Sequence, residues 1–240
     1  MEQINKVLVF DIWGDYAHFR KPETTTSPLS YSIPTGTALA GLISAIIGLK
    51  RDMYYNFFKP EKVKFAIKIL SSIKKDRINI NLIKTDDGFY LWDIKKNPRF
   101  PAPIEFIKNP KYRIYFWIDD EEKYNNLKNF LKEHKSFYTP YLGISEMIAN
   151  FKFIGEYKPE VILNYNDPID IHTVINKDKY HIKIEDKKRY IVEKIPLYMN
   201  EKRVVIEYAN VIFEADGSNL KIIKNNSNVY RVDGDNVVFL

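Results

Sequence analysis

Hydrophobic and polar positions recur with two different periods in the first fifty residues, and each period predicts a different element. Residues 7–13 alternate in the manner of a strand, and a long polar loop follows them. After that loop, five apolar residues recur three and four positions apart and form one stripe of a helix. They are Leu39, Leu42, Ile43, Ile46 and Ile47. Gly48 stands where such a helix ends in the left-handed conformation.

Alternation in the next part of the chain predicts strands at residues 64–70 and 77–83. A turn at 86–88 and an apolar run at 89–92 make the second strand one arm of a projecting basic hairpin, a thumb at about 71–98. An ordinary amphipathic hairpin has the same geometry. Three prolines within 99–110 predict an edge or a loop.

A strong strand is predicted at 112–118, and the acidic run 119–122 then begins a helix at about 121–135. We interpret that run as a helix start matched to the helix dipole, not as a metal site. A second short helix is expected at 144–150, and the pattern is all β from about residue 160.

The order of these elements predicts an α+β protein. Strand, helix, strand, hairpin, strand and helix is the order of a ferredoxin-like βαββαβ domain that carries a β-hairpin insertion. We therefore expect this domain at 1–140 and a smaller β-rich region at 141–240.

Composition narrows the class of protein. The chain has 240 residues, of which 45% are hydrophobic and 15% aromatic, so a folded core is expected. The absence of cysteine excludes disulfides, thiolate metal sites and cysteine nucleophiles. No signal-peptide pattern is visible, and the longest weakly polar run, 38–49, is too short to span a bilayer. We expect a cytoplasmic protein without a metal or cofactor.

Positive charge is concentrated in one segment. The formal net charge is +6, and residues 61–115 hold 13 Lys and Arg against 6 Asp and Glu, a net of +7. Such a concentration of positive charge is expected of a surface that faces a polyanion. A solvated lysine-rich surface has the same composition.

The polar loop and the helix start carry the candidate chemistry. A cationic and aromatic cluster precedes a run of hydroxyl residues, and the start of the helix offers backbone N–H groups that attract anions. One face of the helix is small (Thr37, Gly41, Ser44, Gly48), so another backbone or a ligand can come close. A packing helix behind an ordinary loop fits the pattern equally well.

Three segments resemble a known family. Residues 10–49, FDIWGDYAHFRKPETTTSPLSYSIPTGTALAGLISAIIGL, look like the N-terminal signature of the fifth Cas protein family. Residues 112–115 and 138–143 also resemble family motifs at suitable positions. These proteins are RAMP-superfamily subunits of type I CRISPR effector complexes, and the similarity is closest to type I-B-like members. It is dense over 7–51, patchy to about 155 and weak beyond.

The resemblance implies a non-catalytic RNA-binding subunit that caps the 5′ handle of the CRISPR guide RNA in an antiviral ribonucleoprotein complex. It also implies contacts with the backbone subunit, through the thumb, and with the large subunit, so that target DNA is met only indirectly and no membrane is involved. The RNA-binding residues carried over are Tyr16, His18, Arg20, Lys21, Thr24, Thr25, Thr26, Ser27, Tyr31, Thr35, Gly36, Thr37 and Arg51. The expected thumb contacts to RNA or to the backbone subunit are Lys74, Lys75, Arg77 and Lys84.

Two other functions stay open. One is a metal-independent endoribonuclease that processes CRISPR repeat RNA, because type I-C relatives use a tyrosine with a lysine–histidine pair. This chain offers His134-Lys135 in the reverse order, and His18 as a possible general acid or base. The other is a basic interaction module without a specific RNA. No phosphate-binding GxxxxGK[ST] loop, nucleophile-elbow or zinc pattern is present, and we expect no enzyme activity.

Overall fold

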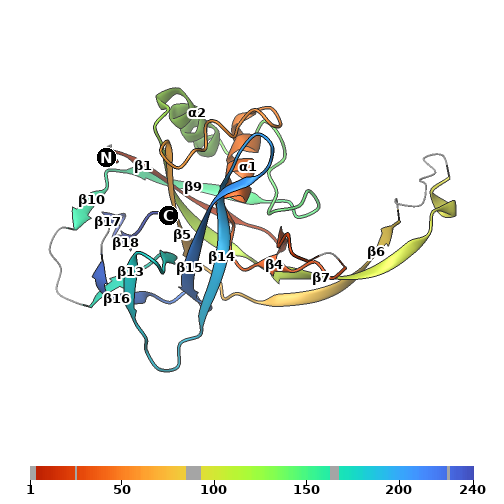
Figure 1. Ribbon diagram of the computed structural model, residues 1–240. Coiled ribbons are helices and arrows are strands. Elements are labelled where there is room, and N and C mark those ends of the chain that lie inside the picture. Colours follow the sequence, from red (N-terminus) through yellow and green to blue (C-terminus); the bar gives the residue numbers. More distant parts are fainter. Residues whose placement is uncertain (1–3, 25, 85–92, 163–167, 226–227) are drawn as a thin grey trace.

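A four-stranded antiparallel sheet lies at the centre of the protein, in a computed structural model that describes residues 4–24, 26–84, 93–162, 168–225 and 228–240 (Figure 1). Its strands, in spatial order, are β5 (Val63–Ile69), β8 (Lys111–Ile118), β1 (Val7–Trp13) and β9 (Asn150–Tyr157). The strands predicted at 7–13, 64–70 and 112–118 are therefore confirmed, each within one residue of its bounds. Because β9 pairs with β1, the sheet continues beyond residue 140.

Both faces of this sheet are buried. One face, which includes Phe10, Ile114 and Phe116, packs against the helices. The other, which includes Val9 and Tyr115, packs against strands near the C-terminus. Burial on both faces explains why β1 is almost continuously apolar, since no position along it has to face water.

Two α-helices lie on the same face of the sheet. Helix α1 (Gly36–Ile47) begins at Thr35, whose side chain accepts a hydrogen bond from the Ala38 amide at 3.1 Å, and Gly48 ends it with φ 78°. Helix α2 (Glu121–Lys132) begins at Asp120, which accepts from the Lys123 amide at 3.0 Å. The predicted end of α1 at Gly48 and the interpretation of the acidic run as a helix start are confirmed, while α2 ends three residues before the expected 135.

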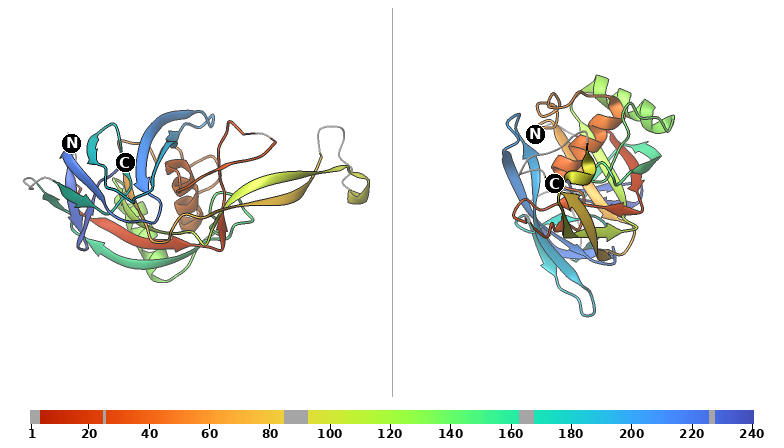
Figure 2. Two further views of the ribbon diagram at one scale, coloured as in Figure 1. Left: turned by 90° about the horizontal axis from the view of Figure 1, so that it is seen from below. Right: turned by 90° about the vertical axis from the view of Figure 1, so that its right-hand side faces the viewer.

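A long hairpin extends away from the rest of the chain (Figures 1 and 2). Its arms are β6 (Lys75–Ile83) and β7 (Arg99–Lys108), with a short 3-10 helix, η1 (Ile94–Lys96), before the second arm. The hairpin is longer than the predicted 71–98, and the return arm is the proline-containing segment. The turn and the apolar run expected at 86–92 lie outside the described residues.

The prolines fit β7 because of the direction of their nitrogens. Pro101, Pro103 and Glu105 alternate along β7, and the Glu105 amide donates to the Pro28 carbonyl, away from β6. The proline nitrogens point the same way, so no hydrogen bond of the β6–β7 ladder is lost. The expectation of an edge is confirmed for this part of β7.

Short strands connect the loop after β1 to the hairpin. Strand β2 (Tyr16–Ala17) pairs with the end of β7, while β3 (Phe19–Arg20) pairs with β4 (Ser30–Tyr31). The loop is thus folded back on itself and held against the root of the hairpin.

The rest of the chain is β, as predicted. The strands are β10 (Glu160–Ile162), β11 (Ile169–Ile171), β12 (Ile175–Asn176), β13 (Tyr180–Lys183), β14 (Tyr190–Met199), β15 (Val205–Glu214), β16 (Leu220–Asn225), β17 (Val229–Val232) and β18 (Asp235–Val237). The β14–β15 ribbon crosses α1 (Figure 1). The short helix predicted at 144–150 is wrong, because Tyr141 and Ile148 form an isolated bridge and β9 already begins at Asn150.

Membrane-spanning helices and metal-binding clusters are both absent from the described residues. No helix there combines the length and the apolar character that crossing a membrane requires. No group of three or more His, Asp or Glu side chains is arranged there to hold a metal ion.

Candidate nucleic-acid interface

A groove of about 710 Å³ lies beside α1. Three parts of the chain that are distant in sequence form it: α1 with the segment after it, the segment 138–141, and the tip of the β14–β15 hairpin. The lining residues are Gly41, Ser44, Ala45, Leu49, Arg51, Asp52, Tyr54, Tyr55, Tyr138, Thr139, Tyr141, Met199 and Arg203. The structure thus brings the helix of the family-like N-terminal segment together with the family-like segment at 138–143.

Two of the four residues of the small face that the sequence singled out, Gly41 and Ser44, belong to the lining from α1. A Cβ atom added at Gly41 would meet no other described atom within 4 Å, so this face opens into the groove instead of packing against a neighbour. Ser44 lies one turn further along the same face and is 2% exposed. The interpretation in which a ligand can approach fits the geometry at Gly41, whereas Gly48, at the end of the same face, packs against Phe137.

Charged side chains mark the rim of the groove. Arg203 Nη2 donates to Asp52 Oδ1 at 2.8 Å, and the Tyr55 hydroxyl donates to the same oxygen at 3.1 Å. The hydrogen bond from Arg203 is the main reason that the pKa of Asp52 lies below its ordinary value. Arg51 Nε lies 3.6 Å from Asp52 Oδ2, with its side chain 80% exposed. Two guanidinium groups and one carboxylate leave the rim positively charged.

Four tyrosines give the groove an aromatic lining. The rings of Tyr54 and Tyr55 lie 4.7 Å apart, while Tyr138 and Tyr141 are 47% and 41% exposed. Burial raises the pKa of Tyr54 to about 12. Exposed aromatic faces next to cations are what single-stranded nucleic acids use for base stacking.

The predicted loop residues form a second cluster, and many of them serve the fold. Glu193, on β14, is buried and accepts hydrogen bonds from Lys21 Nζ at 3.1 Å and from the Ser32 amide at 2.8 Å. Lys21 also lies over the ring of Tyr31, which is 4% exposed and cannot stack on a base. Burial raises the pKa of Tyr31 to about 12.

His18 is buried, which corrects its expected role. Its side chain is 3% exposed, its Nδ1 donates to the Glu105 carbonyl at 2.7 Å, and its ring packs against Phe106. Burial lowers the pKa of His18 from its ordinary value. Enclosed in this way, the imidazole holds the loop against β7 and exposes almost no surface to a phosphate. Tyr16 packs against the same Phe106 ring.

The residues of the hydroxyl run and of the helix start also fall into two groups, those with partners within the fold and those that are exposed. Thr24 closes the loop, because its hydroxyl donates to the Lys21 carbonyl and accepts from the Leu29 amide. Thr35 caps α1, and its hydroxyl lies 2.9 Å from that of the half-buried Thr37. Gly36 lies so close to β14 that an added Cβ would be 2.3 Å from the Leu197 carbonyl oxygen, so the helix start is covered. The exposed members are Arg20, Thr26 and Ser27, and Thr25 lies outside the described residues.

The basic residues of the hairpin also have different surroundings. Lys75 is partnered within the chain, with Nζ 2.8 Å from the Ser30 carbonyl and 3.0 Å from Glu105 Oε1. Lys74 and Arg77 are exposed, and Lys84 is half-buried. The backbone of Lys84 continues the β6–β7 ladder by donating to the Pro98 carbonyl.

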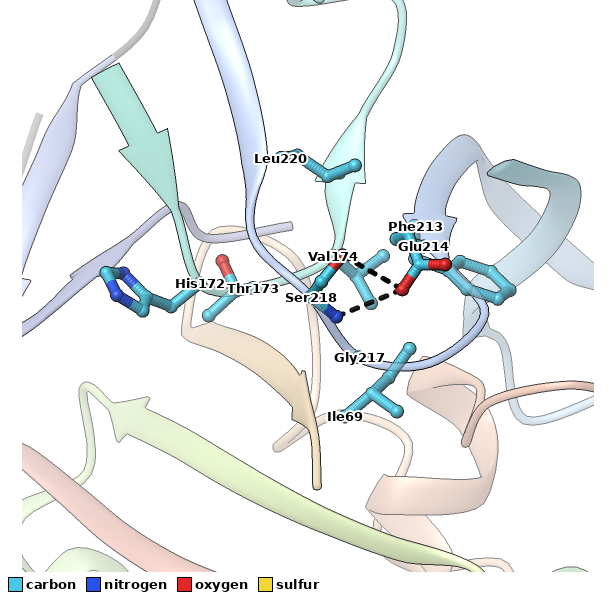
Figure 3. A pocket seen from close by; sticks show the side chains of 9 residues that line it. All are labelled: Ile69, His172, Thr173, Val174, Phe213, Glu214, Gly217, Ser218 and Leu220. Atoms are coloured by element: carbon cyan, nitrogen blue, oxygen red, sulfur yellow. Dashed lines mark hydrogen bonds between the residues drawn. The ribbon is translucent and has the colours of Figure 1, made fainter. Parts of the chain in front are cut away.

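A second cavity, between β5 and the C-terminal strands, is too small for an organic ligand (Figure 3). Its volume of about 10 Å³ is that of roughly one water molecule. The Glu214 carboxylate, at its edge, accepts from the amide and the hydroxyl of Ser218 at 3.1 and 3.0 Å. These groups hold the turn after β15.

Comparison with known proteins identifies a class and then a family. The chain is a CRISPR-associated protein. The family described as "CRISPR-associated protein (Cas_Cas5)" matches residues 7–213, and the chain belongs to it. The resemblance of the N-terminal segment to the fifth Cas family is therefore confirmed.

One curated relative is named "CRISPR pre-crRNA endoribonuclease Cas5d" and comes from Thermus thermophilus. It is 25% identical over 156 residues, which are 58% of this chain and 61% of the relative. The chain thus matches about three fifths of that relative's length.

Two solved structures have a similar fold. A CRISPR protein from Archaeoglobus fulgidus has a TM-score of 0.57 and 15% identity, with 97% of each chain covered. A chain of a structure titled "CRISPR RNA-guided surveillance complex" has a TM-score of 0.53 and 12% identity, with 88% of this chain and 91% of that chain covered. At these identities the comparison establishes an α+β fold shared with CRISPR-associated proteins.

Proposed function

We propose that this protein is the RNA-binding subunit that holds the 5′ handle of the guide RNA in a type I CRISPR effector complex. The observation that carries the proposal is the groove beside α1. It joins an open helix face, a cationic rim and exposed tyrosines, and two of its three walls come from the family-like segments. Cations near the RNA backbone and aromatic rings near splayed bases are the contacts that single-stranded RNA requires.

We also infer that β1, α1, β5, β8, α2 and β9 form the expected ferredoxin-like βαββαβ unit. The antiparallel order β5-β8-β1-β9 and the two helices on one face of the sheet support this inference. On this view the β6–β7 hairpin is the thumb inserted between β5 and β8. The division between the two regions then falls after β9, at about residue 157 and not at residue 140.

The partners proposed from the family resemblance are the backbone subunit, at the hairpin, and the large subunit, in a prokaryotic cytoplasmic complex. The hairpin's extension away from the body supports the first contact (Figure 2). The exposed Lys74 and Arg77 stay in the proposed interface, together with Lys84, Arg51, Arg20, Thr26 and Ser27.

The name of the Thermus relative, a pre-crRNA endoribonuclease, favours a second candidate, a ribonuclease that processes CRISPR repeat RNA. Among the residues that the structure describes, no histidine lines the groove, and His134 packs its ring 4.8 Å from that of Phe151. We therefore favour RNA binding without cleavage over ribonuclease activity. Incubation of repeat RNA with the protein in EDTA tests this choice: site-specific cleavage that is lost in His134→Ala would establish the ribonuclease.

The proposed function is tested with repeat-derived handle RNA and with the nucleic acid that copurifies. We expect one uniform 5′ sequence in the bound RNA, and weaker binding of the handle by Arg51→Gln. Lys183→Gln, an exposed cation on β13, is the matched control and should bind as the parent does. Random copurified RNA, or equal losses in both variants, would contradict a handle-specific groove and favour the basic interaction module.

A further inference from the structure

The floor of the groove contains a buried hydroxyl without a partner. Ser44 is 2% exposed, and its Oγ has no hydrogen-bond partner among the described residues. An unsatisfied buried hydroxyl is costly, and native proteins contain few of them. Ser44 belongs to the lining of the groove, one helical turn from the open position at Gly41. A group bound in the groove can supply the missing partner.

The groove is suited to a flat, partly polar ligand. Its volume of about 710 Å³ is within the range of sites that enclose small molecules. Tyr138 and Tyr141 present exposed rings on one side, and Gly41 contributes no side chain to the floor. At the rim, the exposed guanidinium of Arg51 is placed to meet an anionic group outside the groove.

These features match the parts of a single nucleotide. A nucleobase has two flat faces that stack on aromatic rings and an edge of donors and acceptors, and its phosphate stays near the cations. A peptide side chain has no comparable combination of flat faces, polar edge and attached phosphate. The Ser44 hydroxyl turns about one bond between three staggered positions, so it can be drawn toward a base edge.

We propose that the groove beside α1 takes one unstacked nucleobase and that the Ser44 hydroxyl recognises its edge. This inference rests on the proposed RNA-binding function and adds to it a pocket with base preference. A serine hydroxyl donates and accepts, so it discriminates by the geometry of the edge that reaches it and not by charge.

The full-length protein is titrated with AMP, GMP, CMP and UMP, with binding followed by chemical-shift changes of the tyrosine rings. One nucleotide is expected to bind best. Gly41→Leu places a side chain in the open space and should weaken binding at least about tenfold, because stacking in the groove is lost. Gly41→Ala adds only a Cβ in that space and should stay close to the parent.

Ser44→Ala should keep binding but reduce the preference among the four nucleotides by about three- to tenfold, since one hydrogen bond to the edge is removed. Ser145→Ala removes an exposed hydroxyl that does not line the groove and serves as the matched control. Equal binding of all four nucleotides by the parent, or an unchanged preference in Ser44→Ala, would overturn the role of Ser44. Absence of binding by any of them would overturn the pocket.

The same variants are assayed with repeat-derived handle RNA, which separates this inference from the proposed function. If Gly41→Leu binds the handle as the parent does and no mononucleotide binds, the pocket is wrong and the handle-binding function stands. If mononucleotides bind with the expected preference but the handle does not, the pocket stands and the handle-binding function is wrong.

Discussion

Lys75 Nζ lies 3.0 Å from Glu105 Oε1, and this ion pair joins the two strands at the root of the β6–β7 hairpin. The same ammonium group donates to the Ser30 carbonyl, so it also holds the loop after β1 in place. A residue that the sequence suggested as an RNA contact is thus part of the support on which the proposed interface is built.

We expect Lys75→Met to lower the free energy of unfolding by about 1 to 3 kcal/mol, because Glu105 and the Ser30 carbonyl lose their donor. Burial opposes ionisation of Glu105, but Lys75 and the Ser30 amide together hold the pKa of Glu105 below its ordinary 4.5. A lowered carboxyl pKa stabilises the fold above pH 4.5 and less as the pH falls through the folded-state value. Urea unfolding at several pH values measures this dependence. The free energy of unfolding should vary less with pH in Lys75→Met than in the parent. Lys74→Met, at an exposed neighbouring residue, should match the parent.

His18 should behave as a core residue. Burial lowers its pKa below 6.5, so the unfolded chain takes up a proton below that pH while the folded chain does not. Stability should therefore fall as the pH is lowered through 6.5, and the fall should be smaller in His18→Gln. The salt dependence of RNA binding should be the same in His18→Gln as in the parent. A flatter salt dependence would show that His18 contacts phosphate after all.

Substitutions of Gly41 and Ser44 should both leave the stability of the fold unchanged or raise it. Gly41→Leu should raise the free energy of unfolding by up to about 1 kcal/mol, since glycine is a poor helix former and no described atom lies within 4 Å of the added Cβ. Ser44→Ala should be neutral or stabilising, because an unsatisfied hydroxyl is removed. Thermal unfolding measures both. A clear loss in either variant would mean that the small face packs against the fold.

The local features of the fold were predictable because they depend on neighbours in sequence. The spacing of the apolar residues and the Gly48 stop define α1, and the acidic residues after β8 define the start of α2. Strand β7 was predicted only as an edge or a loop. Its prolines are compatible with strand pairing only because their nitrogens face away from β6. The sequence alone does not reveal the register of the two strands, and so it does not reveal this direction.

The candidate site was predictable only in part, because its members are far apart in the chain. Lys21 is paired with the Glu193 carboxylate, 172 residues away in the chain. The sequence around Lys21 therefore did not show that its ammonium group already has a partner within the fold. Arg51 was identified, but Tyr54, Tyr55 and Arg203 were not. The signal for the tyrosines was an aromatic pair that begins three residues after Arg51, while nothing local connects Arg203 to the groove.

If the groove binds RNA as proposed, Asp52 competes with RNA phosphates for the cations of the rim. Asp52→Asn should leave Arg51 and Arg203 more available and increase both the affinity for handle RNA and its salt dependence. Fluorescence anisotropy over a range of salt concentrations measures both quantities. Asp186→Asn, at an exposed acid between β13 and β14, is the control for the change in net charge. An equal gain in both variants would show only a long-range effect of charge.

Arg20 and Lys21 are adjacent in sequence, yet substitution of Arg20 should weaken RNA binding while substitution of Lys21 should lower stability. Arg20 is exposed, so Arg20→Gln should bind handle RNA more weakly, and the slope of log K against log salt should drop by about 0.7, the value for one lost contact to a single-stranded phosphate. Lys21 is held by Glu193 and lies over Tyr31, so Lys21→Gln should lower the free energy of unfolding with little change in the slope. Salt titrations and urea unfolding on both variants separate the two effects. A reduced slope in Lys21→Gln at full stability would show that its ammonium leaves Glu193 for the RNA, and an unchanged slope in Arg20→Gln would remove this loop from the interface.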